Sequence, residues 1–238
     1  MMKAKILIII LLLMSFLSLN GQDNRNIAKV QEYDMILSAD SLLSECKDYE
    51  SYKSVYQYLM YGFSELGANM VLDYMKSLPY FGFIDADENQ KQEIQAIADS
   101  YDRVRIGADA PRINSMTIEG ENFNLYNIES KYTIILFWSY SCPHCQDLIK
   151  ELARFVKEQD DIALVTVCVS DDLKKVKRFL KKNDLGKCYN ICDGQRWDSP
   201  IIDDYAVVMT PSMMLLDSEK KIILKPFDIE EILNNIEL

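Results

Sequence analysis

The chain has few of the side chains from which metal sites are usually built. His144 is the only histidine, and it lies inside the only C-x-x-C motif, formed by Cys142 and Cys145. A structural zinc site needs four ligands, which usually come from two paired motifs. Cys188 and Cys192 do not have the spacing of a second zinc motif. We therefore expect no metal and read the C-x-x-C as a redox motif.

Basic residues are also in deficit. The 238 residues include 26 Lys and Arg against 37 Asp and Glu, which gives a net charge of -11. Binding to a phosphate backbone requires clustered basic side chains, so we expect no nucleic-acid partner. The rest of the composition is ordinary for a globular protein, and the length allows one large domain or two smaller ones.

No apolar run has the length of a typical membrane span. Residues 6–13 are continuously apolar, follow Lys3 and Lys5, and give way to small or polar residues up to Gly21. A spanning helix needs about 20 apolar residues, whereas this pattern is typical of a secretory signal peptide. We predict a signal peptide over residues 1–21 and export to the periplasm. A retained anchor is the less favoured alternative, and only then would the membrane be a partner.

Residues 22–105 are predicted to form a mainly helical N-terminal domain. Apolar side chains recur at helical spacing in four segments, and eight of the 14 tyrosines lie between residues 33 and 80. We favour packing between helices as the role of these tyrosines, with a surface for partner proteins as the alternative. The four predicted helices are centred on residues 35–43, 52–63, 71–75 and 94–101.

Residues 106–238 alternate strand and helix patterns, which predicts a second domain. A hairpin is expected over 113–125, and the unbroken apolar runs 132–138 and 162–169 are typical of strands buried on both faces. Ser170 is expected to cap a basic helix over 173–182, and Asp228 a closing helix. Further strands are predicted at 189–192, 213–216 and 221–224. Repeated β-α-β units favour a sheet with parallel strands and helices on both faces.

The C-x-x-C lies where a buried strand meets an amphipathic helix. Pro143 suits the first helical position, and the partial positive charge of a helix N-terminus stabilises a thiolate. Cys142 is therefore the candidate nucleophile, and Cys145, one turn later, the thiol that resolves a mixed disulfide. No cofactor is expected beyond the redox-active Cys142–Cys145 disulfide.

Three separated segments resemble the thioredoxin-like family, and within it the exported TlpA/ResA type of thiol–disulfide oxidoreductase. They are residues 106–111, 137–145 and 205–212, and the resemblance covers residues 106–238. It implies a thioredoxin-like fold, a mixed sheet flanked by helices, with a cis Thr210–Pro211 bond beside the cysteines. The substrate-binding residues that it implies are Thr210, Pro211, Trp138 and Tyr140.

The chain also departs from this family. Leu136 and Leu148 stand where relatives carry acids that are thought to help the second thiol lose its proton. Asp147 and Glu151 are near, but helical geometry directs them towards solvent. Pro143 and His144 resemble the dipeptide of the strong oxidant DsbA, so we expect a more oxidising potential than that of thioredoxin. The direction of electron flow stays open.

The favoured function is thiol–disulfide exchange with exported proteins, together with a membrane redox partner. The alternatives are a non-catalytic thioredoxin-like binding module, a peroxiredoxin, and a copper chaperone. Ser139 breaks the T-x-x-C pattern of peroxiredoxins, and a copper chaperone needs a histidine far from its cysteines. Cys46, Cys168 and Cys188 are expected as buried thiols, and a Cys168–Cys192 disulfide is the less favoured alternative.

Overall fold

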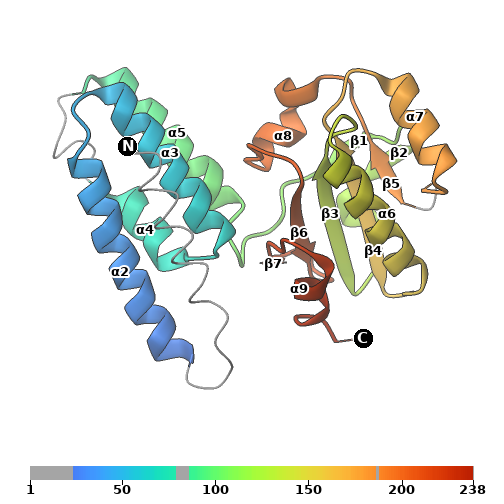
Figure 1. Cartoon of the computed structure of the whole chain (residues 1–238), viewed down its shortest axis with the longest axis horizontal. Helices are drawn as coiled ribbons and strands as arrows, with labels where there is room; N and C mark the ends of the chain where they lie inside the picture. The colour runs from blue at the N-terminus through green and yellow to red at the C-terminus, as the bar shows by residue number, and fades with distance from the viewer. Residues whose placement is uncertain (1–23, 79–85, 186–187, 238) are drawn as a thin grey trace. The chain divides into compact units, whose positions relative to one another are not determined.

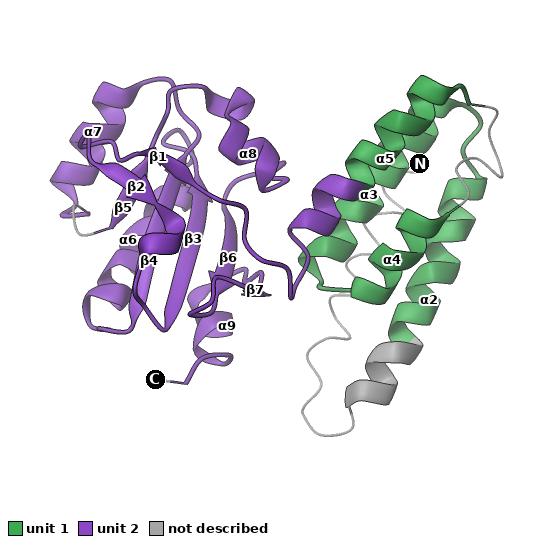
Figure 2. Ribbon diagram, turned by 180° about the vertical axis from the view of Figure 1, so that it is seen from behind, with its two compact units in different colours: residues 1–98 green, residues 99–238 purple. Residues whose placement is uncertain are grey.

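The computed structural model describes residues 24–78, 86–185 and 188–237. The predicted signal peptide lies outside these residues. The chain divides into two compact units, Met1–Ala98 and Asp99–Leu238 (Figure 2). The sequence pattern predicts this division after residue 105. In the structure it falls after Ala98, within the helix Glu88–Arg103.

The first unit is helical, as expected. Its described helices, which correspond to the four predicted segments, are α2 (Asn24–Ser44), α3 (Tyr49–Glu65), α4 (Asn69–Ser77) and α5 (Glu88–Arg103). Asp48 begins α3 with a capping box, in which its carboxylate accepts the Ser51 N–H. Within the described part of the chain, no helix combines the length and apolar character that a membrane crossing requires.

Three tyrosines pack between the helices of this unit, in agreement with the favoured interpretation, whereas Tyr33 and Tyr58 are exposed. The Tyr49 hydroxyl donates to Glu93 at 2.7 Å and so joins α3 to α5. Tyr56 is fully buried and donates to the main-chain carbonyl of α4 residue Met75. The hydroxyl of Tyr74 completes the set by joining α4 to Asp40 of α2 at 2.7 Å. These rings therefore carry polar links as well as apolar surface.

The second unit is built on a five-stranded mixed sheet (Figure 1). The strand order is β5-β4-β3-β6-β7, in which β3, β4 and β5 are parallel and β6 runs antiparallel to both of its neighbours, β3 and β7. The predicted hairpin is present as a separate pair, β1 (Asn114–Met116) and β2 (Asn122–Asn124). The strands of the main sheet are β3 (Tyr132–Trp138), β4 (Ile162–Cys168), β5 (Tyr189–Ile191), β6 (Ser212–Leu216) and β7 (Ile222–Leu224).

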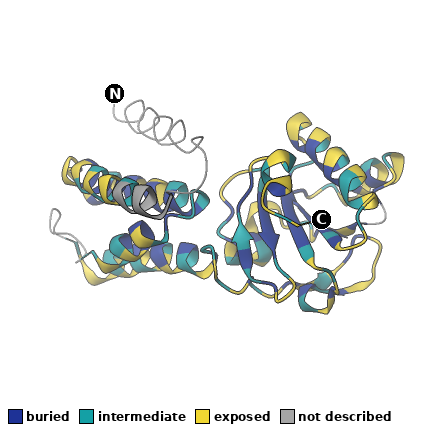
Figure 3. Ribbon diagram, turned by 90° about the horizontal axis from the view of Figure 1, so that it is seen from below, coloured by how far each residue is buried: buried dark blue, intermediate teal, exposed yellow. Residues whose placement is uncertain are grey.

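Two hydrophobic clusters cover the faces of this sheet, whose strands are largely buried (Figure 3). Side chains alternate along β3, so Leu136 and Trp138 face the cluster of α6 (Pro143–Lys157), α7 (Leu173–Lys182) and α9 (Ile229–Leu233). Ile135 and Phe137 face the hairpin and α8 (Pro200–Asp204). The thioredoxin-like mixed sheet flanked by helices is therefore confirmed.

Two local details differ from the sequence-based expectation. Asp172, not Ser170, caps α7: its carboxylate accepts the Lys175 N–H at 3.0 Å, while the Ser170 hydroxyl accepts the Asp172 N–H. The short helix α8 was not predicted. Asp228 caps α9 as expected.

Candidate active site

The junction of β3 and α6 presents the first cysteine. Cys142 is the N-cap of α6 in an extended conformation, with Pro143 at the first helical position. Its sulfur accepts the main-chain N–H of Cys145 at 3.3 Å, and its own N–H donates to the Ser139 carbonyl. The sulfur thus occupies the place where a helix offers unpaired N–H groups and partial positive charge. Because Cys142 is only half-buried, a thiolate there is accessible.

The second cysteine lies one turn later and is fully buried. Burial raises the pKa of Cys145 to about 11, and its hydrogen bond with Cys142 adds to the rise. Hydrogen bonds from the Ser139 backbone and the Thr210 side chain act in the opposite direction. The two thiols therefore differ in access, and Cys145 is held protonated at neutral pH.

The structure brings Thr210 and Pro211 to this site from far along the chain. Their peptide bond is cis, and β6 begins at the next residue, Ser212. Ser212 pairs with Phe137 of β3 in an antiparallel ladder, which lays the Thr210 side chain against Cys145. Thr210 and Pro211 are both half-exposed, so this segment borders the cysteines and is open to solvent.

Trp138 and Tyr140 have different environments. Trp138 is fully buried and its ring lies 5.5 Å from that of Phe179, so it has no surface to offer a substrate. We correct its expected role from substrate contact to packing beneath the site. Tyr140 is half-exposed, meets Phe179 edge-on at 6.0 Å, and its carbonyl accepts the Gln146 amide at 2.6 Å. Of the two rings, Tyr140 alone can border a bound segment.

His144 is exposed on the first turn of α6, next to the nucleophile. Neighbouring Asp147 pairs with Lys150 at 2.6 Å, and this bond, with a smaller contribution from His144, lowers the pKa of Asp147. Asp147 and Glu151 are exposed, as their helical positions indicated. Leu136 and Leu148 belong to the same buried cluster as Cys145, and no carboxylate is among the described groups that shift the Cys145 pKa.

Two exposed apolar residues near the site were not singled out from the sequence. Val208 and Met209 are 44% and 49% exposed, immediately before Thr210. Their position ahead of the family's proline is the signal that could have identified them. Together with the half-exposed Tyr140 they supply apolar contact surface. Elsewhere in the described residues, no group of three or more His, Cys, Asp or Glu side chains is arranged to hold a metal ion.

Comparison with known proteins gives this geometry its context. Residues 106–225 match the model of the AhpC/TSA family. The chain belongs to this family. Among its curated relatives, the thiol–disulfide oxidoreductase ResA of Bacillus cereus is 26% identical over 127 residues, which cover 52% of this chain and 70% of the relative. ResA of Bacillus thuringiensis subsp. konkukian is 26% identical over 125 residues, covering 51% and 69%.

A solved structure supports the fold. It is a domain of a possible thiol–disulfide isomerase from Cytophaga hutchinsonii, with a TM-score of 0.50 and 24% identity over 55% of this chain and 89% of that one. At this identity the likeness concerns the fold alone. Together with the curated relatives, the family match confirms a TlpA/ResA-type protein and a redox enzyme of the thiol–disulfide oxidoreductase class.

Proposed function

We propose that this protein exchanges disulfides with exported proteins through Cys142 and Cys145. One observation carries the proposal: a half-exposed cysteine caps α6 while a buried cysteine lies one turn later and donates its N–H to the first sulfur. A binding module would not need a thiol at each of these positions. Apolar or small residues would pack equally well there.

The proposed reaction has two steps. The Cys142 thiolate attacks a substrate disulfide, and one substrate sulfur leaves as a thiolate while a mixed disulfide forms. The Cys145 thiol then loses its proton and its sulfur attacks Cys142, which releases the second substrate thiol and leaves a Cys142–Cys145 disulfide. The reverse sequence oxidises a substrate dithiol. In both directions Cys142 is the sulfur that meets the substrate, because Cys145 is fully buried.

The substrate is proposed to be an extended protein segment that lies along residues 208–211. Val208 and Met209 offer exposed apolar surface, and Thr210 and Pro211 lie beside the thiols. Such a segment can reach Cys142, whereas a peroxide requires a threonine at the position of Ser139, as the T-x-x-C pattern has it. Export would place the enzyme in the periplasm, with a membrane redox protein as the second partner.

His144 supports an oxidising role. The positive end of α6 and, when it carries a proton, the His144 ring beside Cys142 stabilise the thiolate, and this stabilises the reduced form. Reference potentials of about −270 mV for thioredoxin and −120 mV for DsbA bracket the expected value. We therefore propose net oxidation or isomerisation of substrates, with a potential clearly above that of thioredoxin.

Equilibration with glutathione buffers tests the redox assignment. The redox state of the Cys142–Cys145 pair is read by alkylation and mass analysis of residues 132–150. The expected result is a single two-electron transition of this pair. His144→Ala should shift the midpoint to a more negative potential. A midpoint close to that of thioredoxin in the unmodified protein would remove the oxidising role while leaving exchange intact.

Trapping tests turnover on proteins. Cys145→Ala in the exporting host should accumulate mixed disulfides through Cys142, visible as slower bands that collapse on reduction. The matched control is the double variant Cys142→Ala/Cys145→Ala, which removes both thiols of the motif and leaves only buried cysteines. Equal banding from both variants, or none from either, would count against the proposed exchange. Terminal sequencing of the same purified protein tests export, with a mature start near Gln22 expected.

A further inference from the structure

A second pair of cysteines meets beneath the site. Val167 of β4 is in register with Ile191 of β5, so the residues that follow, Cys168 and Cys192, are neighbours at the ends of two parallel strands. Neighbouring strands lie about 4.8 Å apart, which is within the Cα separation that a disulfide spans. The Cys192 thiol donates to the Ser170 carbonyl at 3.4 Å, and the Cys168 and Cys192 thiols are close enough to shift each other's pKa.

This inner pair shares its surroundings with Cys145. Cys145, Cys168 and Cys192 belong to one buried cluster on the α6 face of the sheet. Interaction with the Cys168 thiol lowers the pKa of Cys192, whereas the same interaction, then burial, and to a smaller extent the nearby Cys145 raise the pKa of Cys168. Isolated buried cysteines act as small apolar residues. Two buried thiols that follow paired residues on neighbouring strands and interact with each other are instead placed as a dithiol.

We propose that Cys168 and Cys192 form a second redox pair that the Cys142–Cys145 disulfide oxidises within the same molecule, an inference that rests on the proposed function. The Cys168 sulfur bonds to Cys145 as Cys142 leaves as a thiolate. The Cys192 sulfur then bonds to Cys168, and Cys145 leaves. Two thiol protons pass to the departing sulfurs, and two electrons move from the inner pair to the outer pair. The molecule then exchanges four electrons.

Oxidation of the protein with oxidised glutathione, followed by tryptic peptide mapping, tests whether Cys168 and Cys192 form a disulfide. Cys168 lies in peptide 158–174, Cys192 with Cys188 in peptide 188–196, and the outer pair in peptide 132–150. The expected result is a fall from six thiols to two, with 158–174 linked to 188–196. Fragmentation of the linked peptides identifies Cys192 rather than Cys188 as the partner.

The Cys142→Ala variant tests the route. Cys168 and Cys192 are 4% and 8% exposed, so glutathione alone should form the link at least about tenfold more slowly in this variant. Equal rates in the two proteins would overturn the internal transfer. An internal disulfide in 132–150 without the inner link contradicts only this inference. If 132–150 stays reduced throughout in excess oxidised glutathione, and the inner link forms equally fast in Cys142→Ala, the proposed function is contradicted as well.

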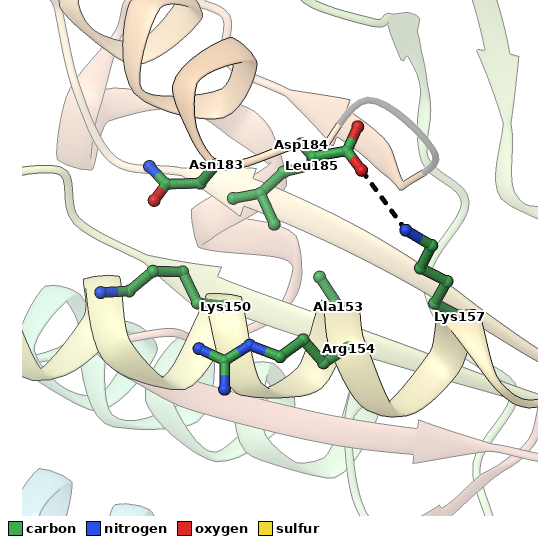
Figure 4. Close-up of a pocket in the computed structure, with 7 residues that line it drawn as sticks. All are labelled: Lys150, Ala153, Arg154, Lys157, Asn183, Asp184 and Leu185. Atoms are coloured by element: carbon green, nitrogen blue, oxygen red, sulfur yellow. Dashed lines mark hydrogen bonds and ion pairs between the residues drawn. The ribbon is translucent and has the colours of Figure 1, made fainter.

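A separate feature is a basic groove between α6 and α7. A hollow of about 430 Å³ starts at Tyr140 and Phe179 and is lined by Lys150, Lys175, Arg178 and Lys182. A smaller hollow of about 140 Å³ shares Lys150 with it and continues along α6 past Arg154 to Lys157 (Figure 4). We call the two hollows together the basic groove. Its stretch from Lys150 to Lys157 is roughly 10 Å at the helical rise.

Much of this charge is not neutralised. Asp147, Asp172 and Asp184 pair with Lys150, Lys175 and Lys157. Across the described residues, no carboxylate forms an ion pair with Arg154, Arg178 or Lys182. The helix α7 contains six basic residues and no acidic one, although the whole chain carries a charge of -11. A local positive field on an acidic protein steers an acidic partner to one place.

The geometry points to an acidic segment of the substrate protein as the occupant of this groove. The groove begins at Tyr140, next to the loop that carries Cys142, and is longer than a single carboxylate needs. The Tyr140 and Phe179 rings supply apolar contact at the end near the nucleophile. This inference also rests on the proposed function and names the substrate by its charge.

Two peptides test the groove. Each carries one cysteine as the same activated disulfide, but in one peptide this cysteine is flanked by Asp and Glu and in the other by Asn and Gln. The reduced protein should react about tenfold faster with the acidic peptide at low salt, and the ratio should approach one at high salt. Arg178→Glu/Lys182→Glu should abolish the ratio. Lys174→Glu/Lys181→Glu is the matched control, since these exposed residues of α7 do not line the groove.

If Lys174→Glu/Lys181→Glu loses the preference for the acidic peptide as fully as Arg178→Glu/Lys182→Glu, the groove is not the binding site. The preference then reflects the overall charge of α7. Equal rates for both peptides in the unmodified protein would overturn the binding site as well. Failure of both peptides to react at all would instead contradict the proposed function, so the two failures are distinguishable.

Discussion

The helical unit joins its helices through tyrosine hydroxyls, whereas the α/β unit joins its strands through main-chain ladders. Ladders fix the register, and register is what lays Ser212 beside Phe137 and hence Thr210 beside Cys145. Side-chain links between helices fix positions less tightly. A site that needs two thiols and a distant proline at fixed separations is therefore found on the sheet, and the predictions below test this difference.

The largest contrast is expected between cysteines of the two units. Cys142→Ala removes the nucleophile and should lower the rate of disulfide exchange by about 10³-fold or more, with little change in stability. Cys46 is buried in the helical unit, so Cys46→Ala should cost about 1 kcal/mol of unfolding free energy and leave exchange unchanged. Exchange assays and urea titrations of both variants measure this. Loss of exchange in Cys46→Ala would break the comparison.

Packing beneath the site gives the next largest effect. Trp138 is fully buried, so Trp138→Ala should destabilise the α/β unit by about 3–5 kcal/mol. The other tryptophan, Trp197, is 45% exposed in the same unit, and its fluorescence reports the transition. Tyr52→Ala is the counterpart in the helical unit. If Tyr52→Ala shifts the unfolding transition seen by Trp197 fluorescence as far as Trp138→Ala does, the two units unfold together.

Sequence patterns predicted those parts of the fold in which local and tertiary preferences agree. The apolar run 132–138 matches β3 residue for residue because a strand buried on both faces needs no alternation. The short helix α8 has too few residues to show a period. Ser170 and Asp172 are both good capping residues, and only the path of the chain after β4 decides between them.

The candidate site was predictable only in part. Cys142 and Cys145 follow from local order, namely strand, cysteines, proline and helix. The approach of Thr210 to Cys145 depends on pairing between β3 and β6 and entered only through the family resemblance. Trp138 differs from its expected role because a residue at the end of a strand can point either into the core or towards the site. It lies on the same face of β3 as Leu136, which directs it into the core.

The pH dependence of mixed-disulfide release, which requires the buried Cys145 thiol to lose its proton, is expected to be an effect of intermediate size. Burial raises the pKa of Cys145 to about 11, so at neutral pH the reactive thiolate is a small fraction. Below that pKa the fraction grows with pH, and release of a mixed disulfide should accelerate about tenfold per pH unit from pH 7 to 10. Stopped-flow release of a fluorescent glutathione adduct from Cys142 measures this. A flat profile would show that another group removes the proton, despite Leu136 and Leu148.

The smallest effects on stability are expected from removing the hydroxyl of one buried tyrosine in each unit. Tyr56 and Tyr205 are both buried, and each donates its hydroxyl to a main-chain carbonyl, that of Met75 at 3.1 Å and that of Pro111 at 2.7 Å. Tyr→Phe at either position leaves a carbonyl without this donor and should cost about 1–2 kcal/mol. Trp197 fluorescence should detect Tyr205→Phe, and far-UV circular dichroism Tyr56→Phe.

Exchange activity then separates the two tyrosines. The ring of Tyr205 packs at 5.2 Å on Phe137, whose strand pairs with the start of β6, so loss of its hydroxyl can loosen the segment before Thr210. Tyr205→Phe should therefore raise the substrate concentration needed for half-maximal exchange, while Tyr56→Phe leaves it unchanged. Equal effects of the two variants on exchange would mean that the helical unit, too, holds the site in place.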